Sequence, residues 1–224
     1  MRDNRTELIF VLDRSGSMEH LTEETIGGFN SLIEKQKEES KGEVFVTTVL
    51  FDDKYELLHN HKPLDEIQRL TKHDYYARGC TALLDAVGRT IDNVGERLST
   101  TDEAERPGKI LFVITTDGYE NASRDYAKRK VKEMITLQQE TYNWKFLFLG
   151  ADIDAVGEAD SLGIRSAGAC MPTATPQGVK SSFNAVSKIA NFVCAAPSFR
   201  RKEGNLELDE MFDAECTKAF SEVE

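Results

Sequence analysis

Short, continuously apolar segments that alternate with helical patterns constrain the fold of this chain most. The apolar segments, each of strand length, are residues 7–12, 43–51, 109–116 and 145–149. The intervening segments expected to be helical are residues 22–37, 81–98, 124–140, 155–162 and 176–194. Strands that are apolar along their whole length are buried on both faces, which is typical of a parallel sheet covered by helices. The pattern therefore predicts an α/β fold.

Two further segments bring the expected sheet to six strands. Asp52 and Asp53 are expected to form only a turn, after which residues 54–59 return as the second strand of a hairpin. Residues 167–171 are expected to form a short last strand. Because a hairpin partner runs antiparallel, the prediction is a mostly parallel six-stranded sheet with one antiparallel strand.

The first apolar segment ends in Asp13-Arg14-Ser15-Gly16-Ser17, a turn with three oxygen-bearing side chains. Their alternate spacing lets the Asp13 carboxylate and the Ser15 and Ser17 hydroxyls converge on one point. One carboxylate and two hydroxyls at the end of a buried strand indicate part of a site for a hard cation. On a purely structural interpretation, the turn only leads into the next helix, which Thr22 could cap.

Two other polar turns are expected at the same edge of the sheet, because open α/β sheets bind ligands beyond the carboxyl ends of their strands. One is Gly79-Cys80-Thr81, where Thr81 opens a helix, and the other is Thr115-Thr116-Asp117-Gly118, which follows a strand. If the two strands are neighbours, Asp13 and Asp117 lie close together and repel unless a cation neutralises them. Two carboxylates and three hydroxyls suit Mg²⁺, with room for water and one external oxygen.

Each of these residues also has a purely structural interpretation. Thr81 could be only a helix N-cap, and Asp117-Gly118 is a common turn pair. Asp85 could support the site from one helical turn after Thr81, but an acid on the helix face is the simpler interpretation. Glu120 could fix a loop or contact a partner, and it is not included among the expected ligands. The occurrence of all three turns together favours the metal site.

Taken in order, Asp13-x-Ser15-x-Ser17, Thr81 and Asp117-Gly118 resemble the metal-ion-dependent adhesion site of von Willebrand factor type A domains, over residues 7–196. The resemblance implies a doubly wound, Rossmann-like sheet whose antiparallel strand lies at one edge. It also implies that Ser15 and Ser17 bind the metal directly, Thr81 directly or through water, and Asp13 and Asp117 mostly through water. Mg²⁺ is the expected ion, with Mn²⁺ and Ca²⁺ as alternatives.

The function implied by this resemblance is a protein-binding module and not an enzyme. A partner's Asp or Glu side chain would complete the coordination of the metal. The intracellular bacterial branch of the family is the closer likeness, given the Asp117-Gly118-Tyr119-Glu120-Asn121 turn and the expected lack of a secretory signal. Relatives of that kind work with chaperone-like ATPases, in metal-resistance or stress-response systems, or beside kinases and phosphatases.

A magnesium-dependent phosphohydrolase with Asp13 as its nucleophile is the alternative function. Haloacid dehalogenase-type phosphatases use Asp-x-Asp, in which the second Asp is the general acid. Here Ser15 stands at that position and cannot act as an acid at neutral pH. A nucleotide-binding Rossmann domain is disfavoured as well, because Gly27-Gly28 lies inside a predicted helix and no Gly-x-Gly-x-x-Gly follows a strand.

Composition argues against several classes of partner. The net charge of -11 disfavours nucleic acid and anionic membranes. No apolar run approaches the roughly 20 residues that span a bilayer. The polar residues 1–6 predict no secretory signal, and hence a cytoplasmic protein. The four cysteines show no C-x-x-C spacing, which is typical of reduced thiols and not of a zinc site: Cys80, Cys170, Cys194 and Cys216.

The expected organisation is one domain over residues 1–197 and a C-terminal extension over 198–224. The extension begins after Pro197 with a basic, polar segment that includes Arg200-Arg201-Lys202. Residues 206–220 follow as an acidic, weakly amphipathic helix. Two arrangements are open from the sequence: the helix packs back on the domain, or it serves as a docking tail.

Overall fold

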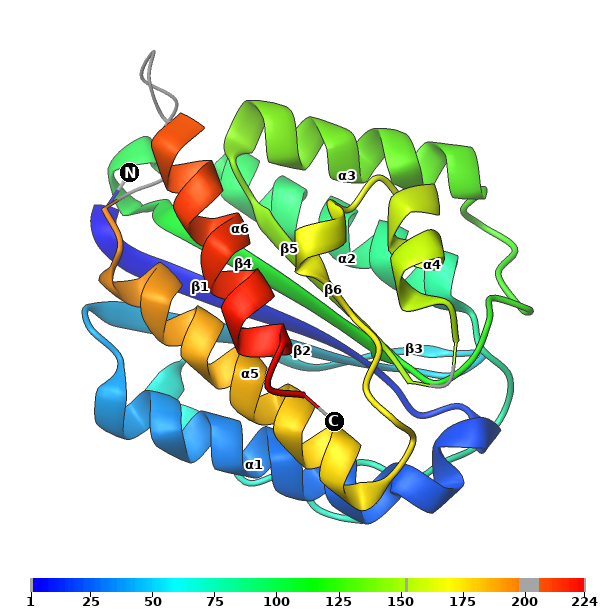
Figure 1. The fold of residues 1–224 in the computed structure, drawn as a ribbon. Coiled ribbons are helices and arrows are strands. Elements are labelled where there is room, and N and C mark those ends of the chain that lie inside the picture. Colours follow the sequence, from blue (N-terminus) through cyan, green and yellow to red (C-terminus); the bar gives the residue numbers. More distant parts are fainter. Residues whose placement is uncertain (1, 152, 198–205, 224) are drawn as a thin grey trace.

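In the computed structural model, which describes residues 2–151, 153–197 and 206–223, the chain forms a six-stranded sheet (Figure 1). The strand order is β3-β2-β1-β4-β5-β6, in which β3 runs antiparallel to β2 and all other neighbours are parallel. The strands are β1 (Arg2–Asp13), β2 (Glu43–Phe51), β3 (Tyr55–Pro63), β4 (Pro107–Thr116), β5 (Lys145–Gly150) and β6 (Ala169–Cys170). The predicted fold class is confirmed, including the antiparallel edge strand.

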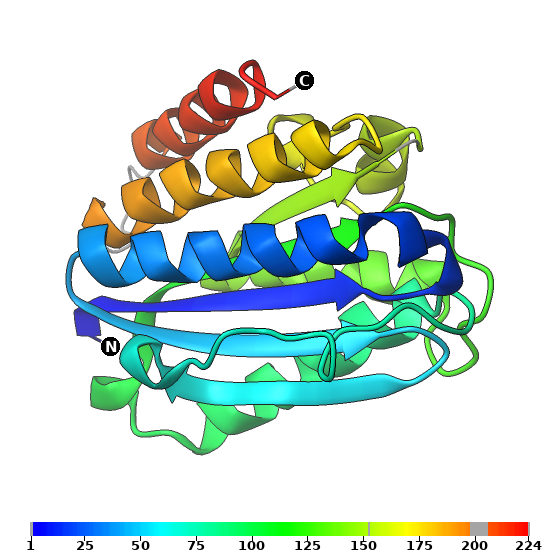
Figure 2. The ribbon, with the colours of Figure 1, turned by 90° about the horizontal axis from the view of Figure 1, so that it is seen from below.

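Helices cover both faces of the sheet. They are α1 (Thr22–Glu39), α2 (Leu83–Thr100), α3 (Lys128–Tyr142), α4 (Ala155–Ser161), α5 (Pro176–Ala195) and α6 (Leu206–Phe220). On one face lie α1 and α5, with α6 beside α5, and on the other lie α2, α3 and α4 (Figures 1 and 2). None of the described helices combines the length and the apolar composition needed to cross a membrane.

Strand β1 lies between β2 and β4 and divides the interior into two cores. Leu8, Phe10 and Leu12 face the core formed with α1 and α5. Ile9 and Val11 face the core formed with α2 and α3. Successive side chains of a strand point to opposite faces, so both faces of β1 must be apolar. This burial explains why the first segment of the sequence is apolar without interruption.

The structure corrects the expected start of α1. Thr22 does not cap this helix, because a 3-10 helix, η1 (Gly16–Leu21), leads directly into it. The Thr22 hydroxyl instead donates a hydrogen bond to the Met18 carbonyl oxygen at 3.2 Å. The Asp-x-Ser-x-Ser turn therefore continues into helical backbone without a separate capping residue.

Two other helices begin later than predicted. Helix α2 begins at Leu83, with Ala82 at its N-cap, so Thr81 is neither the cap nor part of the helix. Helix α3 begins at Lys128 and not at residue 124. The Asp85 carboxylate accepts hydrogen bonds from the backbone N–H groups of residues 124–126, which holds this segment out of the helix.

Helix α6 is present over the predicted residues and packs against α5. Phe212 and Cys216 are buried in the core that α5 shares with the sheet. Asp209 forms an ion pair with Lys145 of β5. The expected basic segment lies in residues 198–205, outside the described residues. The described part of the extension is thus anchored to the domain, as in the first of the two arrangements.

Phe212→Ala is expected to lower the free energy of unfolding by about 3 kcal/mol, because it removes a buried aromatic ring and leaves a cavity. Phe212 is 4% exposed, whereas the adjacent Met211 is 47% exposed. Met211→Ala is the matched control and should change the free energy by less than about 0.5 kcal/mol. Urea denaturation measures both. Equal, small effects would contradict the packing of α6 on the domain.

Candidate metal centre

Three loops meet at the edge of the sheet where the parallel strands end, which we call the carboxyl edge. The Asp13 loop (residues 13–17) follows β1, the Thr81 loop (residues 78–82) precedes α2, and the Asp117 loop (residues 117–126) follows β4. From β1 the chain adds β2 and β3 on one side of the sheet and then crosses over to add β4, β5 and β6 on the other side, so the strand order reverses between β1 and β4. In open α/β sheets this reversal leaves a crevice in which ligands bind.

Asp13 is the last residue of β1 at this edge and is fully buried, with 0% of its surface exposed. Its Oδ1 accepts a hydrogen bond from the Ser15 N–H at 2.7 Å, and its Oδ2 accepts one from the Thr116 hydroxyl at 2.6 Å. The Tyr75 hydroxyl donates to the Asp13 carbonyl oxygen. The carboxylate is therefore fixed by neutral donors. The sequence places Thr116 only in a turn, so its contact with Asp13 is a finding of the structure.

Ser15, Ser17 and Asp117 continue the site toward solvent. The two serine hydroxyl oxygens lie 3.1 Å apart. The Ser17 hydroxyl donates a hydrogen bond of 2.5 Å to Oδ1 of Asp117. Ser15 is buried, Ser17 is exposed and Asp117 is half-buried. The oxygen atoms thus line a path from the buried Asp13 to the surface.

Thr81 joins the same group through the close approach of Gly118. A Cβ atom at Gly118 would lie 3.3 Å from the Thr81 hydroxyl oxygen and 3.4 Å from that of Ser17. Both hydroxyls therefore face one small space beside Gly118, where a larger residue would crowd them. The Thr81 N–H donates to Oδ1 of Asn121 at 3.0 Å, which ties the Thr81 loop to the Asp117 loop. The structure brings all five predicted residues together.

The donor set suits a hard divalent cation. It consists of two carboxylates and three hydroxyls, all oxygen atoms, which Mg²⁺, Mn²⁺ and Ca²⁺ prefer. Among the described residues, no group of three or more His, Cys, Asp and Glu side chains could hold a metal ion. Metal binding at this edge would therefore depend on the Ser15, Ser17 and Thr81 hydroxyls as much as on the acids. The residues present fit the ion that the resemblance implies.

Burial sets the ionisation of Asp13. Desolvation raises the pKa of this carboxyl group, the hydrogen bonds from Thr116 and Ser15 lower it, and the charge of Asp117 raises it; the resulting pKa is about 6. No cationic side chain is among these causes. A divalent ion next to this carboxylate would add a positive charge and lower its pKa.

Two other acids are hydrogen-bonded to the surrounding loops. Asp85 accepts the three N–H groups described above, so it fixes the Asp117 loop to α2. Glu120 accepts hydrogen bonds from the N–H groups of Leu84, Ala122 and Ser123 and from the Ser123 hydroxyl. Both acids shape the loop on which Asp117 stands. This arrangement agrees with leaving Glu120 out of the ligand set.

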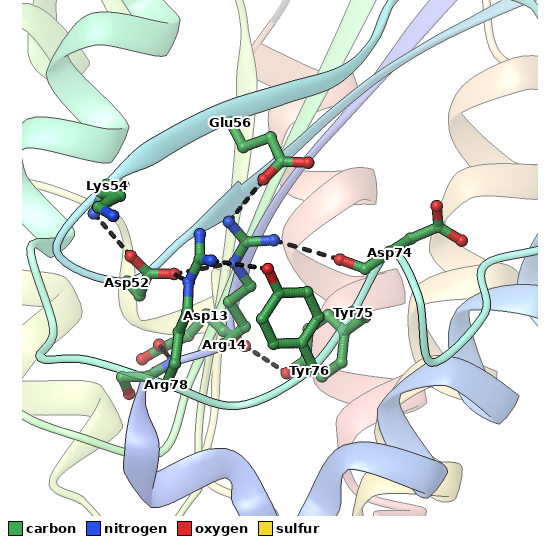
Figure 3. A network of polar contacts seen from close by, with 10 residues as sticks. Asp13, Arg14, Asp52, Lys54, Glu56, Asp74, Tyr75, Tyr76 and Arg78 are labelled. Carbon is green, nitrogen blue, oxygen red and sulfur yellow. Dashed lines mark hydrogen bonds and ion pairs between the residues drawn. The ribbon is translucent and has the colours of Figure 1, made fainter.

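Asp52 corrects the sequence analysis, which treats it only as part of a hairpin turn. Its side chain is 0% exposed, and its Oδ2 accepts hydrogen bonds from Arg14 and Arg78 (Figure 3). Arg14 is itself buried within the Asp13 loop. The signal that could have indicated this contact is the charged Arg14 inside a turn between buried segments, since a buried cation needs an acidic partner.

The comparisons with known proteins bear on the fold. No protein-family model matches the chain, and no curated protein matches it. Its structure is similar to proximal thread matrix protein 1 from the mussel byssus with a zinc-occupied MIDAS motif (TM-score 0.60, 14% identity, 87% of this chain and 47% of that chain). It is also similar to the vWF domain of the type V pili tip protein Mfa5 from Porphyromonas gingivalis (TM-score 0.59, 11% identity, 88% of this chain and 97% of that chain).

A von Willebrand factor type A protein from Catenulispora acidiphila is similar as well (TM-score 0.53, 12% identity, 83% of this chain and 42% of that chain). This chain therefore spans about half the length of the mussel and Catenulispora proteins and nearly all of the Mfa5 domain. At these identities the likeness establishes the architecture. The chain has the von Willebrand factor type A fold.

Asp13→Asn is expected to stabilise the metal-free protein near neutral pH. Because the pKa of Asp13 is raised from 3.8 to about 6, the folded protein binds this proton more tightly than the unfolded chain, and stability falls as pH rises through that interval. Removing the charge should recover about 1–3 kcal/mol at pH 7.5 and little at pH 4. Urea denaturation in the presence of a chelator measures the difference.

The matched control is Asp65→Asn, which neutralises an exposed acid. It should leave the free energy of unfolding unchanged within about 0.5 kcal/mol at both pH values. A destabilised Asp13→Asn variant at pH 7.5 would mean that the Asp13 charge is already compensated in the metal-free protein.

Proposed function

We propose that this chain is a divalent-cation-dependent protein-binding module. Asp13, Ser15, Ser17, Thr81 and Asp117 would hold Mg²⁺, with Mn²⁺ and Ca²⁺ as alternatives. A partner protein would contribute the carboxylate of an Asp or Glu side chain to the ion. The observation that carries the proposal is the convergence of three hydroxyls and two carboxylates at the carboxyl edge of a von Willebrand factor type A fold.

The roles of the residues in this proposal are those that the resemblance to von Willebrand factor type A domains implies. Ser15 and Ser17 would bind the ion directly, Thr81 directly or through water, and Asp13 and Asp117 mostly through water. Since the three hydroxyls are uncharged, a bound ion keeps enough positive charge to attract an external carboxylate. Ser17 is exposed and Asp117 half-buried, so the partner would approach from their side. Thr116 and the Ser15 N–H would hold Asp13 in place throughout.

The comparisons support this proposal in general terms. The mussel protein is described with a zinc-occupied MIDAS motif, so a protein of this fold holds a divalent cation at such a site. Mfa5 is described as a tip protein of pili. Neither description concerns catalysis. These likenesses favour a non-enzymatic module, and the identity of the ion and of the partner is our proposal.

The phosphohydrolase alternative is disfavoured by the geometry of Asp13. A nucleophilic carboxylate needs an oxygen that can reach the phosphorus atom of a substrate. Both oxygens of Asp13 already accept hydrogen bonds, and the side chain is fully buried. Ser15, at the position of the general acid in such enzymes, lies against Ser17. A serine at this position cannot supply the proton that the leaving group requires.

Several finer expectations stay predictions. They are a cytoplasmic location, a bacterial source, a chaperone-like ATPase or stress-response complex as partner, and the division into a domain over residues 1–197 and an extension over 198–224. The similar structures include byssus and pilus proteins, which do not point to a cytoplasmic location. Copurification with and without a chelator, followed by mass spectrometry, would identify the partner and the context.

Millimolar Mg²⁺ is expected to raise the melting temperature of the wild-type protein, and Ser15→Ala is expected to abolish the rise. Binding to the folded state alone stabilises by about 2.7 kcal/mol at one hundred times the dissociation constant. The control is Ser99→Ala, an exposed serine whose hydroxyl contacts only its own helix. Differential scanning fluorimetry with Mg²⁺, Mn²⁺, Ca²⁺ and a chelator measures each variant.

Two outcomes would oppose the proposal. If no divalent ion shifts the melting temperature of the wild type, the site does not bind metal. If the protein hydrolyses p-nitrophenyl phosphate with Mg²⁺ and Asp13→Ala abolishes this turnover, the phosphohydrolase alternative holds instead. In the binding module, metal-dependent copurification should be lost in Ser15→Ala and kept in Ser99→Ala.

A further inference from the structure

A single buried carboxylate joins two of the three loops at the proposed metal site. Oδ2 of Asp52 accepts a hydrogen bond from Nε of Arg14 at 3.0 Å and one from Nε of Arg78 at 2.7 Å (Figure 3). Arg14 belongs to the Asp13 loop, between Asp13 and Ser15. Arg78 belongs to the Thr81 loop. We call Arg14, Asp52 and Arg78 the arginine clamp.

Backbone hydrogen bonds also connect the Asp13 loop to the Thr81 loop. The Arg78 N–H donates to the Arg14 carbonyl oxygen at 2.9 Å, and the Gly16 N–H donates to the Gly79 carbonyl oxygen at 3.1 Å. The Ala82 N–H donates to the carbonyl oxygen of Asp52 at 3.0 Å. The Asp13 loop and the Thr81 loop are therefore in contact along their length, with Asp52 at the centre.

Aromatic and acidic neighbours complete the surroundings of the two guanidinium groups. The guanidinium carbons of Arg14 and Arg78 lie 5.5 and 5.0 Å from the centre of the Tyr76 ring. Arg14 also donates to a carboxylate oxygen of Glu56 at 2.7 Å and to the Asp74 carbonyl oxygen at 3.2 Å. Two cations thus meet two acids, so the cluster of charges is balanced.

Burial of these charged groups without their partners would be energetically unfavourable. Arg14 is 1% exposed and Asp52 is buried, so each would lose hydration without a partner. Burial raises the pKa of Asp52, but the hydrogen bonds from Arg78, the Lys54 N–H and Arg14 outweigh it, and the pKa is lowered overall. The carboxylate is charged, and its Oδ2 can accept from both Nε–H groups only while the Arg14 and Arg78 loops stay close together.

We propose that the arginine clamp is a positioning device that presets the distance between the Ser15–Ser17 hydroxyls and the Thr81 hydroxyl before any ion binds. None of its three side chains would touch the ion. The inference rests on the proposed function, because positioning matters only if these hydroxyls are ligands. Groups behind a metal site that orient its ligands typically change metal affinity about 10–100-fold when removed.

Arg78→Met is the primary test, because the Arg78 side chain is 34% exposed and its loss leaves Arg14 paired with Asp52. Isothermal titration with Mg²⁺ should show an affinity at least about 10-fold weaker than that of the wild type. Asp52→Asn should weaken binding to a similar or greater extent. The double variant should be no weaker than Asp52→Asn alone, since both changes break the same link between the loops.

Glu56→Gln is the matched control. It removes an acid that is hydrogen-bonded to the same Arg14, whereas the Arg78 side chain is hydrogen-bonded to Asp52 and Tyr76, so it leaves the two loops joined. Its Mg²⁺ affinity should stay within about twofold of the wild type. Circular dichroism of each metal-free variant verifies that the fold is retained, and Arg78→Met keeps the experiment decisive if Asp52→Asn does not fold.

Amide hydrogen exchange of the metal-free protein gives a readout independent of the ion. Exchange at the Gly16 N–H, which bonds to the Thr81 loop, and at the Ala82 N–H, which bonds to Asp52, should be faster in Arg78→Met than in the wild type and unchanged in Glu56→Gln. If Arg78→Met and Asp52→Asn bind Mg²⁺ like a wild type that itself binds it, the clamp has no positioning role and the proposed function stands. A wild type that binds no divalent ion overturns both.

Discussion

Burial of β1 on both faces is the constraint on which the rest of the structure depends. Between β2 and β4, covered by two cores, the stretch from Leu8 to Leu12 has no face left for polar side chains. The next residue, Asp13, is the last of the strand, and its carboxylate is also buried from solvent. A charge in such a place is unfavourable unless its neighbours compensate it, so the loops around Asp13 decide what this edge of the sheet can do.

The acidic side chains in and around these loops have different kinds of hydrogen-bond partner. Asp52 is paired with two guanidinium groups, and Asp85 and Glu120 are occupied by backbone N–H groups. Asp13, in contrast, is held by a hydroxyl and an amide, and Ser17 donates its hydroxyl to Asp117. The acids that fix the loops are therefore distinct from the acids proposed to hold the ion. The hydrogen bonds that fix these loops therefore do not use the two carboxylates proposed to hold the ion.

The fold was predictable because its signals are local: continuous apolar strands, helical spacing and a hairpin each appear within about ten residues. The gathering of Asp13, Ser15, Ser17, Thr81 and Asp117 was predictable from strand order and resemblance. The contacts that brace the site were not predictable. Arg14 inside a turn indicates that an acidic partner is needed, but Asp52 lies 38 residues from Arg14 and 26 from Arg78, and the local pattern does not identify it as that partner. The start of α3 depended in the same way on the distant Asp85.

Because the chain is strongly acidic, the presence of the ion would decide whether the proposed site attracts or repels a partner's carboxylate. At a net charge of -11, the protein repels a carboxylate-bearing partner at long range. The five residues alone carry two negative charges, so without an ion their local field adds to that repulsion. A divalent cation cancels those two charges and offers a short contact that uncharged hydroxyls cannot. At about 0.1 M, salt largely screens the repulsion between charges more than about 10 Å apart. It weakens a direct metal–carboxylate contact much less. Loss of the ion would thus turn attraction into repulsion, whereas added salt would change the rate of encounter more than the strength of the bound state.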